Sequence, residues 1–123
     1  MRKAAVYPIK SNAEIEIMAD AGRMLREVMD EVCAAAGEGV ALLELDALAE
    51  SRIKEKKSKP AFKGLYGFPN TLCMSLNEAI VHGIPSNYKL KSGDIISIDC
   101  GLKHKNYYSD MAYTVAIGDI PAE

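Results

Sequence analysis

The sequence changes character at Pro60, and this change limits the possible fold more than any other feature. Before Pro60, apolar residues recur at steps of three and four, as on one face of an α-helix. After Pro60, short runs rich in β-branched and aromatic residues alternate with glycine and proline, which is typical of strands joined by turns. Because the helical segments precede the strands, an α+β fold is predicted, with two N-terminal helices packed on an antiparallel sheet.

The first helix is predicted from about Asn12 to Ala36. Ser11 and Glu14 form a capping-box pattern at its start. The residues of its apolar face are Ile15, Met18, Gly22, Leu25, Met29, Val32 and Ala36. A regular face of this length predicts an amphipathic helix that covers a core.

A second helix is predicted between Gly39 and Pro60, without a good N-cap residue. Its apolar residues are Leu42, Leu45, Leu48, Ala49 and Ile53. Four lysines, at positions 54, 56, 57 and 59, gather at its C-terminal end. Because the helix dipole favours cations there, we interpret them as a solvated helix end rather than a nucleic-acid patch.

The size and charge of the chain indicate one domain over residues 1–123. At 123 residues, folding buries roughly two-thirds of the unfolded surface, enough for one core. The 15 Lys+Arg and 17 Asp+Glu give a formal net charge of −2, which argues against nucleic-acid and membrane partners. Cys33, Cys73 and Cys100 match no zinc spacing, and no signal peptide is recognised, so free thiols and a cytoplasmic location are expected.

Strands are predicted at Thr71–Leu76, Ala79–His82, Ile95–Gly101 and Tyr107–Ile117. In the first of these, the alternation places Leu72, Met74 and Leu76 on one face and Thr71, Cys73 and Ser75 on the other. Glycines, Gly101 among them, are interpreted as turns between strands. Because only Leu102–Asn106 separates the two longest strands, a hairpin is predicted there.

Asp99 and Asp110 fall on one face of this predicted hairpin. With a two-residue loop at His104-Lys105 they lie directly opposite each other, with Cβ atoms roughly 4.5–5.5 Å apart. With the loop at Lys105-Asn106 they become diagonal neighbours at roughly 7–8 Å. Both registers bring the two carboxylates within reach of one ion.

Three interpretations of the aspartate pair stay open. Paired like charges destabilise a sheet unless a proton or a cation lies between them. The pair is therefore a solvent-facing coincidence, a proton-sharing acid pair, or a set of hard-metal ligands. Their face carries the small residues Ser97 and Ala112, whereas the opposite face carries Ile96, Ile98, Met111, Tyr113, Val115 and Ile117, which are expected to join the core.

The histidines and aromatic residues are less informative alone. His82 precedes Gly83-Ile84-Pro85, where a histidine is usually a solvated turn residue, and His104 is expected at a turn tip. Phe62, Tyr66 and Phe68 either line an apolar pocket or pack under a loop.

Together, these residues resemble a known family. The segment 67–85, GFPNTLCMSLNEAIVHGIP, and the segments GDIISID at 93–99 and YYSD at 107–110 closely resemble the bacterial-type (type I) methionine aminopeptidases. These are members of the M24 "pita-bread" metallopeptidase family. The resemblance implies one half of the pita-bread fold, in which two similar halves are related by a pseudo-two-fold axis around a dinuclear metal site.

The resemblance also implies roles for individual residues. Asp99 resembles the bidentate ligand of one metal, and Asp110 the ligand that bridges both. His82 resembles the histidine that contacts the scissile amide region, and so is a catalytic and substrate-binding candidate. The residues where the family lines its methionine pocket are Phe62, Leu65, Phe68 and Cys73, with Leu65 in place of a common tyrosine.

The implied activity is removal of the initiator methionine from N-terminal Met peptides by two divalent metal ions, Mn, Fe, Co or Zn. Two adjacent metals acidify a bridging water and polarise the peptide carbonyl. The family's remaining ligands, one histidine and two glutamates, lie in its second half, which this sequence does not include. We therefore expect weak metal binding and no activity from these 123 residues alone.

Several alternatives follow for the chain itself. It is an excised or engineered half-domain that pairs as a homodimer, a chain that joins a complementary second half, or a non-catalytic module that binds peptide or ribosome. The presence of Asp99, Asp110 and His82 counts against a decayed site.

Overall fold

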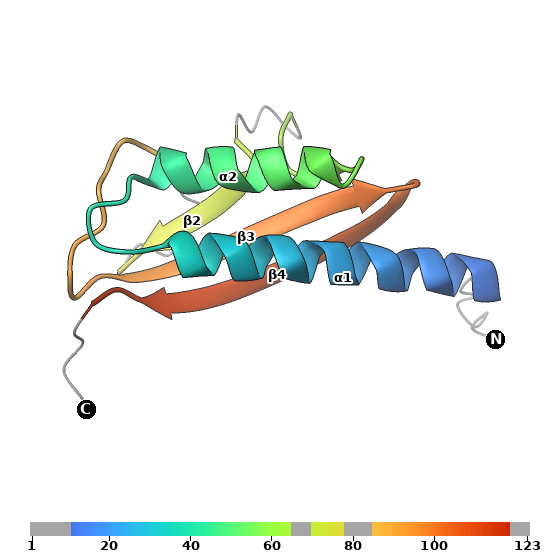
Figure 1. Ribbon diagram of the computed structural model, residues 1–123, viewed down its shortest axis with the longest axis horizontal. Helices are drawn as coiled ribbons and strands as arrows, with labels where there is room; N and C mark the ends of the chain where they lie inside the picture. Colours follow the sequence, from blue (N-terminus) through green and yellow to red (C-terminus); the bar gives the residue numbers. More distant parts are fainter. Residues whose placement is uncertain (1–10, 65–69, 78–84, 119–123) are drawn as a thin grey trace, which may run out of the picture.

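The computed structural model describes residues 11–64, 70–77 and 85–118. Two helices lie on one face of a four-stranded antiparallel sheet, so the predicted α+β fold is confirmed (Figure 1). The elements are α1 (Asn12–Ala35), α2 (Leu42–Glu55), β1 (Lys59–Pro60), β2 (Leu72–Leu76), β3 (Ile95–His104) and β4 (Tyr107–Ala116).

Strand β3 is the centre of the sheet. It pairs with β4 along its whole length, from Ile95 opposite Ala116 to His104 opposite Tyr107. Its other edge pairs with β2 through residues 96–100 and with β1 through residues 102–103. Because successive side chains of a strand point to opposite faces, those of β3 lie alternately under the helices and on the uncovered face of the sheet.

The core lies between the helices and the sheet. The buried stripe of α1 includes Leu25 and Met29, and that of α2 includes Leu45 and Ile53. From the sheet, the fully buried side chains are Leu72, Ile96, Ile98, Cys100 and Leu102. The strand residues expected in the core are confirmed there: Ile117 is 1% exposed, and Met111, Tyr113 and Val115 pack against the core half-buried.

The ends of the helices follow the capping residues. At the start of α1, Ser11 Oγ accepts a hydrogen bond from the Glu14 amide at 3.1 Å, and Glu14 Oε1 accepts one from the Ser11 amide at 3.1 Å. This reciprocal pair confirms the predicted capping box. The start of α2 has no capping side chain, as expected, and its Leu42 and Leu43 amides instead donate to the carbonyl groups of Tyr88 and Ser86, both at 3.0 Å.

Within the described ranges, neither helix is long and apolar enough to cross a membrane.

Candidate metal and substrate site

The candidate site lies on the face of the sheet that α1 and α2 leave uncovered. Along β3, Ile96, Ile98 and Cys100 point into the core, so the alternating residue Asp99 points to the opposite face. Cys73 on β2 is the register partner of Asp99, and Asp110 lies on the adjacent strand β4. The structure therefore brings Asp99, Asp110 and Cys73 together on one surface.

The observed register makes the two aspartates diagonal neighbours. Asp99 pairs with Ala112 and Asp110 pairs with Gly101, so the expectation of directly opposed aspartates is wrong and the shifted register is confirmed. At such a diagonal position the Cα atoms are ~7–8 Å apart. Two carboxylate side chains still reach a common ion across this separation.

The turn geometry explains the shift. Lys105 and Asn106 have φ of 48° and 69°, both left-handed, as a two-residue hairpin turn that matches strand twist requires. Asn tolerates this conformation better than most residues, which favours Lys105-Asn106 over His104-Lys105 as the loop. The expectation that His104 lies at the tip of the turn is therefore wrong. His104 ends β3, is 8% exposed, and its Nδ1 lies 3.1 Å from Ser58 Oγ.

Gly101 has a role in the site that the sequence did not predict. The prediction that it forms a turn between strands is wrong, because Gly101 lies inside β3, which extends to His104. A Cβ atom at Gly101 would lie 3.1 Å from Ala61 Cβ and 3.1 Å from Phe62 Cε1. The Phe62 ring therefore packs directly over Gly101, and the Ala61 amide holds the segment in place by donating to the Gly101 carbonyl at 2.9 Å. A glycine inside a strand pattern is itself a signal of such a close approach.

Phe62 thus lies beside the aspartate pair. Gly101 is two residues from Asp99 on β3 and is the direct register partner of Asp110. An apolar ring and two carboxylates share one small area of the uncovered face. This juxtaposition suits a ligand that has both an apolar side chain and a group that a metal ion can bind.

Cys73 contributes a neutral thiol to this area. Burial, followed by the negative charges of Asp99 and Asp110, raises its pKa above the ordinary value. Across the sheet, Cys100 faces the core, and burial is the main cause that raises its pKa to about 12. All three cysteines are free, as predicted. Because a thiol must be ionised to bind a metal strongly, Cys73 fits the wall of a pocket better than a ligand set.

The donor atoms fit part of a metal site. Asp110 is exposed and Asp99 half-buried, and their carboxylate oxygens suit a hard divalent cation. Among the residues that the structure describes, no group of three or more His, Cys, Asp or Glu side chains is placed to hold a metal. These two carboxylates therefore fit a divalent ion only with further ligands from outside the described part of the chain.

Three of the predicted site residues, Leu65, Phe68 and His82, lie outside the described residues. The same is true of Tyr66 and of the strand predicted at Ala79–His82.

Asp46 supports the site from the side of the helices. It lies on α2, is 8% exposed, and its Oδ1 accepts hydrogen bonds from the Thr71 amide at 3.0 Å and the Leu72 amide at 2.7 Å. Its Oδ2 accepts another from the Asn70 side chain at 3.2 Å. These contacts fix the start of β2 at Leu72, one residue before Cys73. Asp46 is not among the predicted site residues, although a carboxylate on the apolar stripe of a helix, between Leu42 and Ala49, is a signal that the sequence displays.

The chain belongs to metallopeptidase family M24, whose family model matches residues 16–123. Among curated proteins, the methionine aminopeptidase of Helicobacter pylori is 49% identical over 112 residues, which are 91% of this chain and 44% of that protein. The methionine aminopeptidase of Clostridium perfringens is 43% identical over 115 residues, which are 94% of this chain and 46% of that protein. The chain thus spans about half the length of the curated relatives it matches.

Solved structures give the same result. Methionine aminopeptidase from Rickettsia prowazekii superposes with a TM-score of 0.90 at 28% identity, covering 94% of this chain and 47% of that one. A prolidase from Pyrococcus horikoshii has a TM-score of 0.78 at 26% identity, covering 92% and 31% of the two chains. The architecture described here is therefore about half of the pita-bread fold.

Proposed function

We propose that this chain provides one half of the active site of a metal-dependent methionine aminopeptidase, which removes methionine from the N-terminus of peptides. One observation carries this proposal: Asp99 and Asp110 are diagonal neighbours on the uncovered face of the sheet, and the Phe62 ring packs on Gly101, the register partner of Asp110. Membership in family M24 and the similarity to methionine aminopeptidases support it. The single domain over residues 1–123 is then the N-terminal half of a catalytic domain.

Each residue has a separate role in this proposal. Asp99 and Asp110 hold divalent metal ions, which when bound supply a Lewis acid and an acidified water. Phe62, with Leu65, Phe68 and Cys73, forms an apolar wall against the methionine side chain. His82 contacts the amide group that is cleaved. An unbranched apolar pocket selects methionine by shape, and one methylene group more or less changes the free energy by only ~1–3 kcal/mol.

The proposed metal is a divalent ion of Mn, Fe, Co or Zn. Two carboxylates favour hard ions such as Mn and Fe, but the choice also depends on ligands that these residues do not supply. We expect the protein to work in the cytoplasm, where its three free thiols stay reduced.

Titration calorimetry with Mn²⁺ tests the proposed metal ligands. We expect wild-type chain to bind weakly, Asp110→Asn to bind at least about tenfold more weakly, and Asp30→Asn, an exposed change on α1, to bind like wild type. Equal affinity of the wild type and Asp110→Asn would contradict the assignment.

For activity, the corresponding protein that includes a second half should release methionine from a Met-Ala-Ser peptide with added Mn²⁺, and Asp110→Asn should abolish this release.

The uncovered face requires a cover in the complete site. It exposes large side chains, with Ile95 43% and Tyr108 64% exposed. We propose a complementary second half as the cover, with a second copy of this chain as the alternative. Size-exclusion chromatography with light scattering distinguishes the two covers. A second copy as the cover requires that the chain is a stable dimer at tens of micromolar, whereas a monomer supports the second half.

A further inference from the structure

A pair of lysines lies on the same uncovered face, near the end of the hairpin. Lys59 on β1 is the direct register partner of Lys103 on β3. Lys103 alternates with the buried Leu102 and His104, so it points to the uncovered face together with Asp99. The ammonium group of Lys103 lies 5.4 Å from the ring centre of Tyr108, the residue opposite it on β4.

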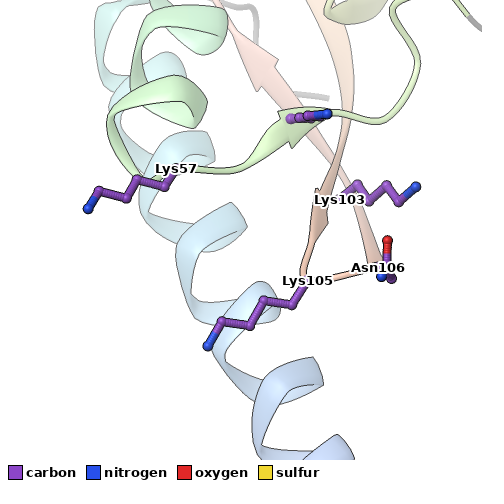
Figure 2. Close-up of a pocket in the computed structure, with 5 residues that line it drawn as sticks. Lys57, Lys103, Lys105 and Asn106 are labelled. Carbon is purple, nitrogen blue, oxygen red and sulfur yellow. The ribbon is translucent and has the colours of Figure 1, made fainter.

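The lysine pair borders a shallow hollow. The hollow has a volume of about 170 Å³ and is lined by Lys57, Lys59, Lys103, Lys105 and Asn106. Figure 2 shows that Lys103 extends in the direction opposite to Lys57 and Lys105. Lys103, and Lys59 directly across from it, are therefore the lysines that a ligand on the uncovered face would meet.

This positive charge is not neutralised within the described part of the chain. Some described cations have carboxylate partners: Lys54 lies 3.8 Å from Glu50, Arg52 lies 3.0 Å from Glu55, and Lys56 pairs with Glu27. No described carboxylate forms an ion pair with Lys59 or Lys103. Like charges directly opposite each other destabilise a strand pair, so an anion between these two ammonium groups would relieve a cost that the fold otherwise carries.

The lysine pair lies at a short, defined separation from the candidate metal ligands. The pair formed by Lys103 and Tyr108 is two residues beyond the pair formed by Gly101 and Asp110. Two residues of a strand span ~6.6–6.8 Å, and the four from Asp99 to Lys103 span ~13 Å. An extended peptide advances by ~3.3 Å per residue, so a peptide whose first residue lies at the aspartates would bring its third to fifth residues to the lysines.

We propose that Lys59 and Lys103 bind carboxylate side chains at the third to fifth positions of the peptide substrate. This inference rests on the proposed function, because it names a substrate preference of the same site. A peptide carboxylate is favoured over a nucleic-acid phosphate for two reasons. The pair shares its face with the proposed peptide site, and the chain as a whole carries a net charge of −2, whereas nucleic-acid binders present a broad basic field.

Fluorescence anisotropy of the 123-residue chain with two labelled peptides tests this inference. One peptide is Met-Ala-Ala-Glu-Glu-Ser and the other Met-Ala-Ala-Gln-Gln-Ser, each labelled at its C-terminal end. At low salt we expect the Glu peptide to bind about three- to tenfold more tightly, the effect of one or two exposed ion pairs, and the difference to shrink at 0.5 M NaCl. The variant Lys59→Gln/Lys103→Gln should remove the difference, whereas the matched control Lys54→Gln/Lys89→Gln, which alters two exposed lysines elsewhere, should keep it.

The outcomes separate this inference from the proposed function. Equal binding of the two peptides, binding of neither, or an unchanged ratio in Lys59→Gln/Lys103→Gln would overturn the inference. Tighter binding of a single-stranded oligonucleotide than of the Glu peptide, lost in the same variant, would also overturn it in favour of a phosphate ligand. Methionine release from both peptides with the second half present, but without a Glu preference, would leave the proposed function intact. Absence of release from either peptide, with the anisotropy ratio maintained, would instead count against the proposed function.

Discussion

Gly101 allows an apolar ring and two carboxylates to share one small area. The absence of a side chain lets the Phe62 ring lie where a Cβ atom would be only 3.1 Å away. Any larger residue there must displace either the ring or the strand. The position of the Phe62 ring relative to Asp99 and Asp110 therefore depends on the absence of a Cβ atom at Gly101.

Gly101→Val should destabilise the fold and displace Phe62. Branched carbons at this position would overlap the ring, and overpacking of this kind costs ~1–3 kcal/mol of unfolding free energy. Urea denaturation measures the loss. Gly37→Ala is the control, because no atom lies within 4 Å of its added Cβ, and it should leave the unfolding free energy within ~0.5 kcal/mol. Equal stability of Gly101→Val and the wild type would show that Phe62 does not pack as described.

At the scale of elements, two buried aspartates hold the ends of strands in place. Asp46 joins α2 to the start of β2, as described above. Asp94 lies before β3 and accepts hydrogen bonds from the Lys91 amide at 2.9 Å, the Tyr88 hydroxyl at 2.8 Å and the Asn77 side chain at 3.2 Å. Both carboxylates therefore position the strands that carry the site residues.

Asp46→Ala should be among the more destabilising single changes in the chain. It leaves the buried amides of Thr71 and Leu72 without an acceptor, at a cost of ~2–4 kcal/mol. Asp46→Asn retains a carbonyl oxygen at nearly the same place, so it should lose clearly less. Thermal and urea unfolding of the two variants compare these losses, and equal losses would argue against the hydrogen bonds as the cause.

Asp94 should contribute to the loss of stability in acid. The Lys91 amide, Tyr88 hydroxyl and Asn77 amide hold the pKa of Asp94 below its ordinary value. Because the pKa is lower in the folded state, its stabilisation is complete above the ordinary carboxyl range and is lost as the pH falls through the lowered value. Asp94→Asn should therefore be less stable than wild type at pH 7, and the difference should shrink towards pH 3. A difference that does not change with pH would contradict this linkage.

At the scale of the whole molecule, one face of the sheet is sealed and the other is open. Helices α1 and α2 cover the first face (Figure 1). Cys100 is completely buried there. Cys73 lies half-buried on the second face, together with the proposed site. The chemistry proposed for this chain is therefore confined to the surface that has no cover of its own.

Thiol labelling should report this difference between the two faces. Burial raises the pKa of Cys100 to about 12, so its thiol is both inaccessible and protonated in the folded chain. With a disulfide reagent at pH 8, Cys33 and Cys73 should react slowly. Cys100 should react only at the rate of global unfolding. Cys100→Ala should remove this last phase alone. Three thiols reacting together under native conditions would contradict the sealed face.

The sequence alone determined the two helices and the later strands β2, β3 and β4, the capping box at Ser11 and Glu14, and the hairpin with both aspartates on one face, but it did not indicate the short strand β1 at Lys59–Pro60. These features depend on periodicity and on contacts between residues three or four apart, which a single sequence displays. Family membership was also readable, because the segments 67–85 and 93–99 are distinctive strings.

Only the tertiary structure decided the register of the hairpin, the burial of His104, the place of Phe62 over Gly101 and the attachment of β2 to Asp46. The register follows from the left-handed turn at Lys105 and Asn106, which the sequence left open against a loop at His104-Lys105. The other three features depend on residues that are distant in sequence: His104 with Ser58, Gly101 with Phe62, and Asp46 with Thr71 and Leu72. Local pattern carries no information about such partners, because the free energy of the contacts arises only when separate elements pack together.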